Sequence, residues 1–145
     1  MNPYQALKDQ HQAEVNNFPI KCAFTKDRLK EIMREWSLPE DDFSTLAEVG
    51  PSSFIRKSDL PEWRNLIQRH NKELNDKILA DKNGTEFVYQ MFMYELGNHE
   101  WIITYDLHDA LAALNLTEDK VYANPTLLKG LKRAMNDIES WHLSH

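Results

Sequence analysis

The sequence predicts a mainly α fold, or α+β with at most a small two- or three-stranded sheet. Apolar residues recur three and four positions apart along most of the chain, which is the period of an amphipathic helix. Only four glycines and six prolines interrupt these segments. The length of 145 residues and the hydrophobic content of 41% are those of one globular domain. A compact multi-helix single domain covering residues 1–145 is therefore expected.

The first half of the chain contains two expected amphipathic helices and a third, shorter one. Pro3 suits the first turn of a helix that Pro19 ends. Thr25 caps a second helix, because its hydroxyl can accept a hydrogen bond from the first turn. A short acidic helix is expected to start at Pro39 and to end near Val49. Two short extended segments are expected, at residues 20–24 and 54–56.

The second half is expected to surround one central helix. A long helix capped by Ser58 or Asp59 runs to about Leu79, and Thr85 starts the next helix, which ends at Gly97 and Asn98. This next helix is apolar on nearly all sides, which is typical of a helix at the centre of a fold. Residues 101–105 favour a strand or a buried connector. Three further helices are expected, over residues 107–114, from Thr117 and from Pro125.

Large apolar residues on the longest or most apolar helices form the candidate core. The residues expected to be buried together are Trp63, Phe87, Met91, Phe92, Leu128 and Leu131. The last helix is expected to turn Leu128, Leu131, Met135, Ile138 and Trp141 inward. Cys22 is the single cysteine, which excludes a disulfide within the chain and a cysteine-based zinc site. Its apolar neighbours predict a small buried residue.

The charge of the chain is unevenly distributed. The formal net charge is −6, and residues 83–119 contain no Lys or Arg. Seven acids lie in that stretch: Glu86, Glu95, Glu100, Asp106, Asp109, Glu118 and Asp119. Such a stretch creates a negative local field that repels nucleic acid and attracts basic protein surfaces. The candidate partner-binding acids are Glu95, Glu100, Asp106, Asp109, Glu118 and Asp119. The alternative is a solvated acidic face that only keeps the protein in solution.

Hydropathy and charge also give an expectation for the location and the partner of the protein. The apolar stretch from Phe87 to Tyr105 is interrupted by Glu95, His99 and Glu100, so no membrane span or membrane partner is expected. The N-terminal sequence lacks the basic and apolar regions of a signal peptide, so a cytoplasmic location is expected. The expected partner is a host-encoded or element-encoded protein with a basic surface, without direct contact to nucleic acid. The pattern leaves the oligomeric state open.

The densest group of metal-ligand residue types surrounds His99 and His108. Histidine nitrogens and carboxylate oxygens suit zinc, manganese or iron, and Glu95 and His99 are four residues apart on one expected helix. No HExxH spacing is present, and Gly97 and Asn98 interrupt the helix between these residues. The favoured interpretation is a hydrogen-bonded structural cluster with no cofactor and no catalytic residue. A small metal-dependent enzyme using His99, His108 and nearby carboxylates is kept as the alternative.

Two further segments carry weaker signals. Arg56 and Lys57 lie in a polar loop before the long helix, which predicts a basic contact surface for a partner, with an ordinary helix start as the alternative. Residues 109–121, DALAALNLTEDKV, have a spacing similar to that of a helix-turn-helix. A recognition helix needs Arg or Lys at base edges and phosphates. Only Lys120 is available there, so DNA reading is not expected.

Several phrases resemble an uncharacterised family of small acidic proteins from phages and mobile elements of gut Firmicutes. They are NPYQALKDQHQAEVNNFPIKCAF at the start, SFIRKSD at 53–59, FVYQMFMYELGNHEW at 87–101 and DALAALNLTEDKV at 109–121. The resemblance implies an accessory protein of an element in conflict with host defences. Such proteins often inhibit by binding, including as acidic mimics of DNA, and an anti-CRISPR-like inhibitor is the specific form implied.

Three classes of function therefore remain open at the level of sequence. The first is a non-enzymatic protein-binding accessory protein that uses an acidic surface against a nucleic-acid-targeting defence system. The second is the small metal-dependent enzyme. The third is a structural or dimerising helical module. The acidic stretch and the resemblance favour the first class.

Overall fold

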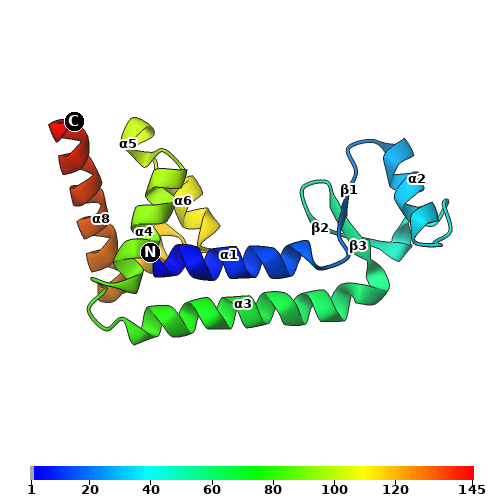
Figure 1. Cartoon of the computed structure of the whole chain (residues 1–145), viewed down its shortest axis with the longest axis horizontal. Helices are drawn as coiled ribbons and strands as arrows, with labels where there is room; N and C mark the ends of the chain where they lie inside the picture. Colours follow the sequence, from blue (N-terminus) through cyan, green and yellow to red (C-terminus); the bar gives the residue numbers. More distant parts are fainter. Residues whose placement is uncertain (1) are drawn as a thin grey trace. The chain divides into compact units, whose positions relative to one another are not determined.

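The computed structural model describes residues 2–145 and confirms the mainly α fold class with one small sheet (Figure 1). Within these residues there are eight α-helices, two short 3₁₀ helices and three antiparallel strands. The chain forms two compact units. The sheet unit comprises His11–Asn71, and the helical unit comprises Lys72–His145 together with the start of the chain up to Gln10. The single domain expected over residues 1–145 stays a prediction.

Two long helices contribute residues to both units. Helix α1 spans Pro3–Asn16, with the Asn2 side chain accepting hydrogen bonds from the N–H groups of Tyr4 and Gln5 at its start. Helix α3 spans Leu60–Ala80, as the long amphipathic pattern predicts. In the sheet unit the rings of His11 and His70 stack at 3.8 Å between centroids. The stacked rings therefore cover one face of each other.

The sheet unit is built from one helix and a three-stranded sheet. Thr25 caps α2, Lys26–Glu35, by accepting a hydrogen bond from the Arg28 N–H at 3.1 Å. Strands β1, Lys21–Cys22, and β2, Leu46–Gly50, both pair antiparallel with the central β3, Ser53–Arg56. The fully buried residues are Ile32 and Met33 of α2 and Ile55 of β3. The 3₁₀ helices are η1, Phe43–Thr45, and η2, Lys57–Asp59.

Two sequence predictions for the sheet unit are wrong. The acidic helix expected up to Val49 is only the single turn η1, whose Asp42 cap accepts a hydrogen bond from the Ser44 N–H. The following residues form β2 because a tight turn through Ser52, with φ of 56°, returns the chain as β3. Cys22 is exposed rather than buried, since it lies in a two-residue strand at the edge of the sheet.

The helical unit surrounds α4, Phe87–Asn98, as expected for a helix that is apolar on nearly all sides. Helices α5 (Trp101–Thr104), α6 (His108–Ala113) and α8 (Pro125–Ser144) contact it, and α7 (Glu118–Tyr122) packs on α8. The start of α4 is held by buried Asp81, whose carboxylate accepts from the N–H groups of Gly84, Glu86 and Val88. Gly130 of α8 allows close contact, because a Cβ there would lie 2.6 Å from Val88 Cγ1.

Segment 101–105 is one helical turn instead of the expected strand. Trp101 is buried in the core around α4, and the segment pairs with no strand within residues 2–145. Glu100 and Tyr105, with φ of 53° and 56°, are left-handed residues that begin and end the turn. Local β propensity is therefore overridden by the burial of Trp101.

The predicted core is confirmed for Phe87, Met91, Phe92 and Leu131, and Leu128 packs partly buried against them. The prediction that Trp63 joins this core is wrong. Trp63 is half-buried in the sheet unit, where its ring contacts Phe18 at 5.2 Å between centroids. Trp141 is also wrong, with 63% of its surface exposed. Helix α8 has 20 residues and α4 has 12. The row of apolar residues on α8 therefore extends beyond the end of α4, which covers its first part.

Replacing Phe92 with Ala is expected to lower the free energy of unfolding by about 3–5 kcal/mol, because the side chain is fully buried and leaves a cavity. Urea unfolding followed by circular dichroism measures this loss. Leu79→Ala, at a position 74% exposed, is the matched control and should change the free energy by less than about 0.5 kcal/mol. A loss below about 1 kcal/mol for Phe92→Ala would place α4 outside the stability core.

Candidate functional site

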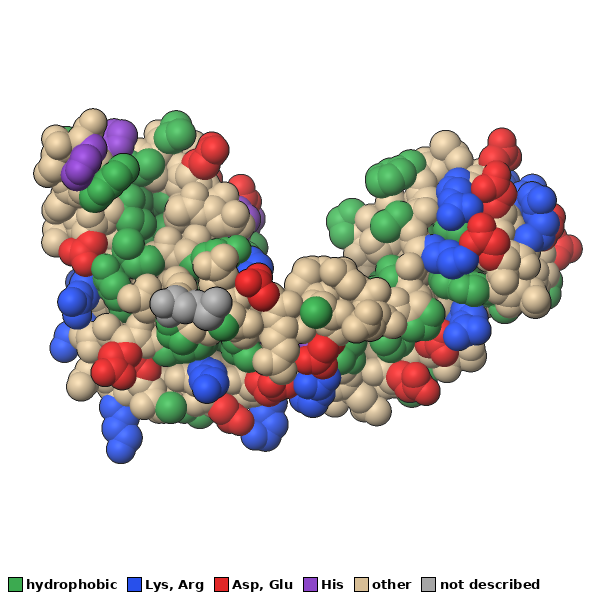
Figure 2. All heavy atoms as spheres, in the orientation of Figure 1, with side chains coloured by type: hydrophobic (Ala, Val, Ile, Leu, Met, Phe, Trp, Pro, Cys, Tyr) green, Lys and Arg blue, Asp and Glu red, His purple; other side chains and the backbone are tan. Residues whose placement is uncertain are grey.

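Five of the six predicted partner-binding acids are exposed: Glu100, Asp106, Asp109, Glu118 and Asp119. These five residues are called the acidic surface, and Figure 2 shows acidic side chains beside α5 and α6. Asp109 lies in the first turn of α6, while Glu118 and Asp119 lie in the first turn of α7. Acids at these positions interact favourably with the positive helix N-terminus. Among residues 2–145, none of the five forms an ion pair within 4.0 Å.

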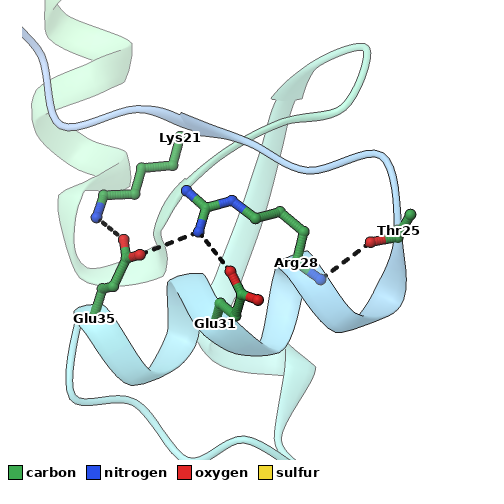
Figure 3. A network of polar contacts seen from close by, with 5 residues as sticks. All are labelled: Lys21, Thr25, Arg28, Glu31 and Glu35. Carbon is green, nitrogen blue, oxygen red and sulfur yellow. Dashed lines mark hydrogen bonds and ion pairs between the residues drawn. The ribbon is translucent and has the colours of Figure 1, made fainter.

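Acids of the sheet unit have a different environment, because several are paired with Lys or Arg. Figure 3 shows Glu35 held by Lys21 and Arg28, with Arg28 Nη1 3.1 Å from Glu35 Oε1 and 3.0 Å from Glu31 Oε2. The hydrogen bond from Lys21, and then that from Arg28, lowers the pKa of the Glu35 carboxyl. Within residues 2–145, no Lys or Arg pairs with the acidic surface in this way. Its charge therefore stays available to a partner.

Exposed apolar side chains lie among these acids in the sequence. Ile103 is 71% exposed, and Tyr105 and Tyr122 are more than half exposed. Large aromatic side chains of this kind are enriched at protein interfaces. The backbone is also strained here, since Glu100 and Tyr105 adopt left-handed conformations that residues of their type rarely adopt. Sequence reasoning missed these apolar residues, although isolated apolar residues within a charged stretch are a usable signal.

Glu95 is not part of this surface, and its predicted role in partner contact does not fit its position. The side chain is fully buried. Glu95 Oε2 accepts a hydrogen bond from the Tyr4 hydroxyl at 2.5 Å, and both carboxylate oxygens lie within 3.1 Å of Lys8 Nζ. Burial, followed by the hydrogen bond to Glu95, raises the pKa of the Tyr4 hydroxyl. Glu95 therefore joins α1 to α4 instead of presenting a charge to a partner.

His99 and His108 do not come together in a set of metal ligands. His99 Nε2 is 3.8 Å from Glu95 Oε1, and His108 is exposed at the start of α6. The Asp106 carboxylate accepts a hydrogen bond from the backbone N–H of His108 at 2.9 Å. In the part of the chain that the structure describes, no three His, Cys, Asp or Glu residues are placed to hold a metal ion. His99 and His108 therefore belong to separate local contacts in this part of the chain.

Arg56 and Lys57 lie in the sheet unit, at the end of β3 and in η2. The Arg56 guanidinium is occupied: its Nε lies 2.8 Å from Asp59 Oδ2, and its Cζ lies 5.9 Å from the centroid of the Trp36 ring. Lys57 is exposed. Of these two residues, Lys57 is therefore the one that forms no ion pair within residues 2–145.

A cleft of about 420 Å³ on the sheet unit was not predicted from the sequence. Its lining includes Phe24, Phe43, Phe54, Leu29, Lys26 and Glu48. Phe24 is 86% exposed, an unusual position for a large aromatic residue. We call this feature the aromatic cleft.

The family model described as "Family of unknown function (DUF7659)" matches residues 3–137. The chain belongs to this family. Membership in DUF7659 agrees with the uncharacterised family expected from the sequence. No curated protein and no solved structure matches the chain. Among the helices described here, none is long and apolar enough to cross a bilayer.

The contact between Tyr4 and Glu95 predicts a loss of stability in alkali. A tyrosine pKa that is higher in the folded state than the ordinary 10.0 stabilises the fold below pH 10, and this contribution is lost as the pH rises above that value. Wild-type protein should therefore lose unfolding free energy more steeply between pH 9 and 11 than Tyr4→Phe. Urea unfolding across this range measures the two slopes.

The control for this comparison is Tyr122→Phe, since Tyr122 is exposed. Its slope should equal that of the wild type. At pH 8, Tyr4→Phe should also be less stable by about 1–3 kcal/mol, because the buried carboxylate loses a donor. Equal slopes for wild type and Tyr4→Phe would contradict the assignment.

The absence of a three-ligand set among the described residues predicts that untagged protein purifies without stoichiometric zinc, manganese or iron. Elemental analysis by inductively coupled plasma mass spectrometry measures the metal content. The comparison is His99→Ala. One equivalent of metal in the wild type that is lost in His99→Ala would overturn the prediction and favour the enzyme alternative.

Proposed function

We propose that the protein acts without catalysis, by binding a protein with a basic surface through the acidic surface of the helical unit. One observation carries the proposal: five exposed acids form no ion pair among residues 2–145, while exposed Ile103, Tyr105 and Tyr122 lie among them in sequence. Unpaired acids steer a basic partner and speed encounter. Aromatic residues supply the apolar contact that slows dissociation. The combination suits protein binding better than mere solubility.

The negative charge of the acidic surface also argues against nucleic acid as the direct partner. Phosphate backbones are repelled by an unneutralised acidic surface, so direct binding of nucleic acid is not proposed. A basic groove that normally holds nucleic acid is the complementary surface. Lys57 of the sheet unit is the remaining basic candidate for a secondary contact.

The biological setting follows from the sequence resemblance and belongs to this proposal. The protein is proposed to be a cytoplasmic accessory protein of a phage or mobile element. Its proposed target is a host system that recognises nucleic acid, with a CRISPR nuclease as the specific case. Occupying the basic groove of such a nuclease would inhibit it by competition with nucleic acid.

Charge reversal tests the proposal. The variant Glu118→Lys/Asp119→Lys should bind its partner at least about tenfold more slowly, because these acids contribute to electrostatic steering. Both positions are exposed in the first turn of α7. Immobilised wild-type protein captures partners from a Firmicutes host lysate at low salt, and surface plasmon resonance on the captured protein gives the rates. Raising the salt should slow association of the wild type in the same way.

The control is Asp9→Lys/Glu139→Lys, which reverses two exposed acids of the helical unit outside the acidic surface. Its association rate should stay within about twofold of the wild type, since steering depends on charges close to the contact. Circular dichroism checks that each variant is folded. An association rate that ignores both salt and the reversal at Glu118 and Asp119 would reduce the acidic surface to a solubilising face.

A further inference from the structure

The aromatic cleft lies next to an open edge of the sheet. The strand order is β1-β3-β2, so β2 is an outer strand, and within residues 2–145 it pairs only with β3. Every second residue of an outer strand directs its N–H and C=O groups away from the sheet. Such an edge can pair with an extended segment of another chain.

The register of the sheet places the cleft on a defined face of this edge. Glu48 of β2 pairs directly with Phe54 of β3, so their side chains are on the same face. Both residues line the cleft, together with Phe24 and Phe43. Figure 2 shows hydrophobic side chains exposed on this unit beside the β2–β3 hairpin. A strand added to β2 would direct alternate side chains toward the cleft.

The charge beside the edge selects a basic segment. Residues 37–51 contain Glu40, Asp41, Asp42 and Glu48 and no Lys or Arg. Glu40 is paired with Arg34 at 2.6 Å, and Asp42 is used as the cap of η1. Asp41 and Glu48 are exposed and form no ion pair within 4.0 Å among the described residues. Lys26, the cation on the cleft, lies over the Phe43 ring, 5.7 Å from its centroid.

We propose that the sheet unit binds an extended, basic segment of a partner protein as a fourth strand on β2. A Lys or Arg of that segment meets Glu48, and an aromatic residue two positions away, on the same face, enters the aromatic cleft. Main-chain hydrogen bonds to Leu46–Glu48 hold the segment, because the register shift between Glu48 and Gly50 ends regular pairing. This surface is separate in sequence from the acidic surface and does not depend on it.

A second copy of the chain is a poor occupant of the same edge. Pairing β2 with β2 of another molecule would bring Glu48 of both copies to one short interface. Like charges that face each other across strands are destabilising. The charge beside the edge therefore favours a basic partner segment over self-pairing.

A displayed library of random dodecapeptides is the probe for this proposal. Selection on the full-length wild-type protein should enrich peptides that carry a basic and an aromatic residue two positions apart. An enriched peptide, added to ¹⁵N-labelled protein, should shift the backbone amides of Leu46–Glu48 in heteronuclear NMR spectra. N-methylating the peptide residues one at a time should weaken binding at least about tenfold at alternate positions only, because every second N–H of an added strand donates to β2.

Two variants of the protein test the aromatic cleft and the acid on β2 separately. Phe24→Ser, at a position 86% exposed, and Glu48→Lys should each weaken the peptide at least about tenfold. Leu79→Ser is the matched control for loss of an exposed apolar side chain, and Glu118→Lys/Asp119→Lys separates this surface from the acidic surface. Both controls should bind like the wild type. The proposal is overturned if selection yields no peptide, or if binding is insensitive to Phe24 and Glu48.

Discussion

One buried carboxylate constrains how the helical unit can pack. Glu95 sits on the apolar helix α4 without solvent contact, and an isolated carboxylate there would cost several kcal/mol. The Tyr4 hydroxyl and the Lys8 ammonium, both from α1, remove that cost through hydrogen bonds and opposite charge. Helix α1 thus covers the side of α4 that carries the only acid within its bounds. Lys8 is committed to this contact and is not available to neutralise acids at the surface.

Local signals predicted the helices whose ends are determined by their own residues. Thr25, Thr117 and Asn124 each accept hydrogen bonds from the first turn that follows, so sequence and structure agree at these points. The predictions are wrong where contacts with residues distant in sequence determine the secondary structure of a segment. Segment 46–50 is a strand because β3 returns beside it, and segment 101–105 is a helical turn because Trp101 is buried around α4. Neither partner can be identified from spacing within the segment.

The same distinction applies to the candidate site. Glu100, Asp106, Asp109, Glu118 and Asp119 were predicted to be exposed, and short polar segments or first helical turns place them there. The prediction for Glu95 is wrong because its acidic neighbours in sequence lie outside the core, whereas its helix places it inside. Met91 and Phe92, four and three residues before it, are fully buried, so the helical period already placed Glu95 on a covered face. The aromatic cleft combines Phe24, Phe43 and Phe54 from three segments, which only the folded sheet unit brings together.

The two units use charge in opposite ways, and this contrast supports a binding role. In the sheet unit, Lys21 and Arg28 neutralise Glu35, and Arg34 neutralises Glu40, although exposed pairs of this kind add little to stability. The acidic surface of the helical unit has no such pairing among residues 2–145. Its first-turn acids at α6 and α7 support their helix N-termini, but that role does not require Glu100 or the exposed Ile103 and Tyr105. A purely structural account therefore explains some acids but not the exposed apolar residues among them in sequence, whereas a protein interface would use both.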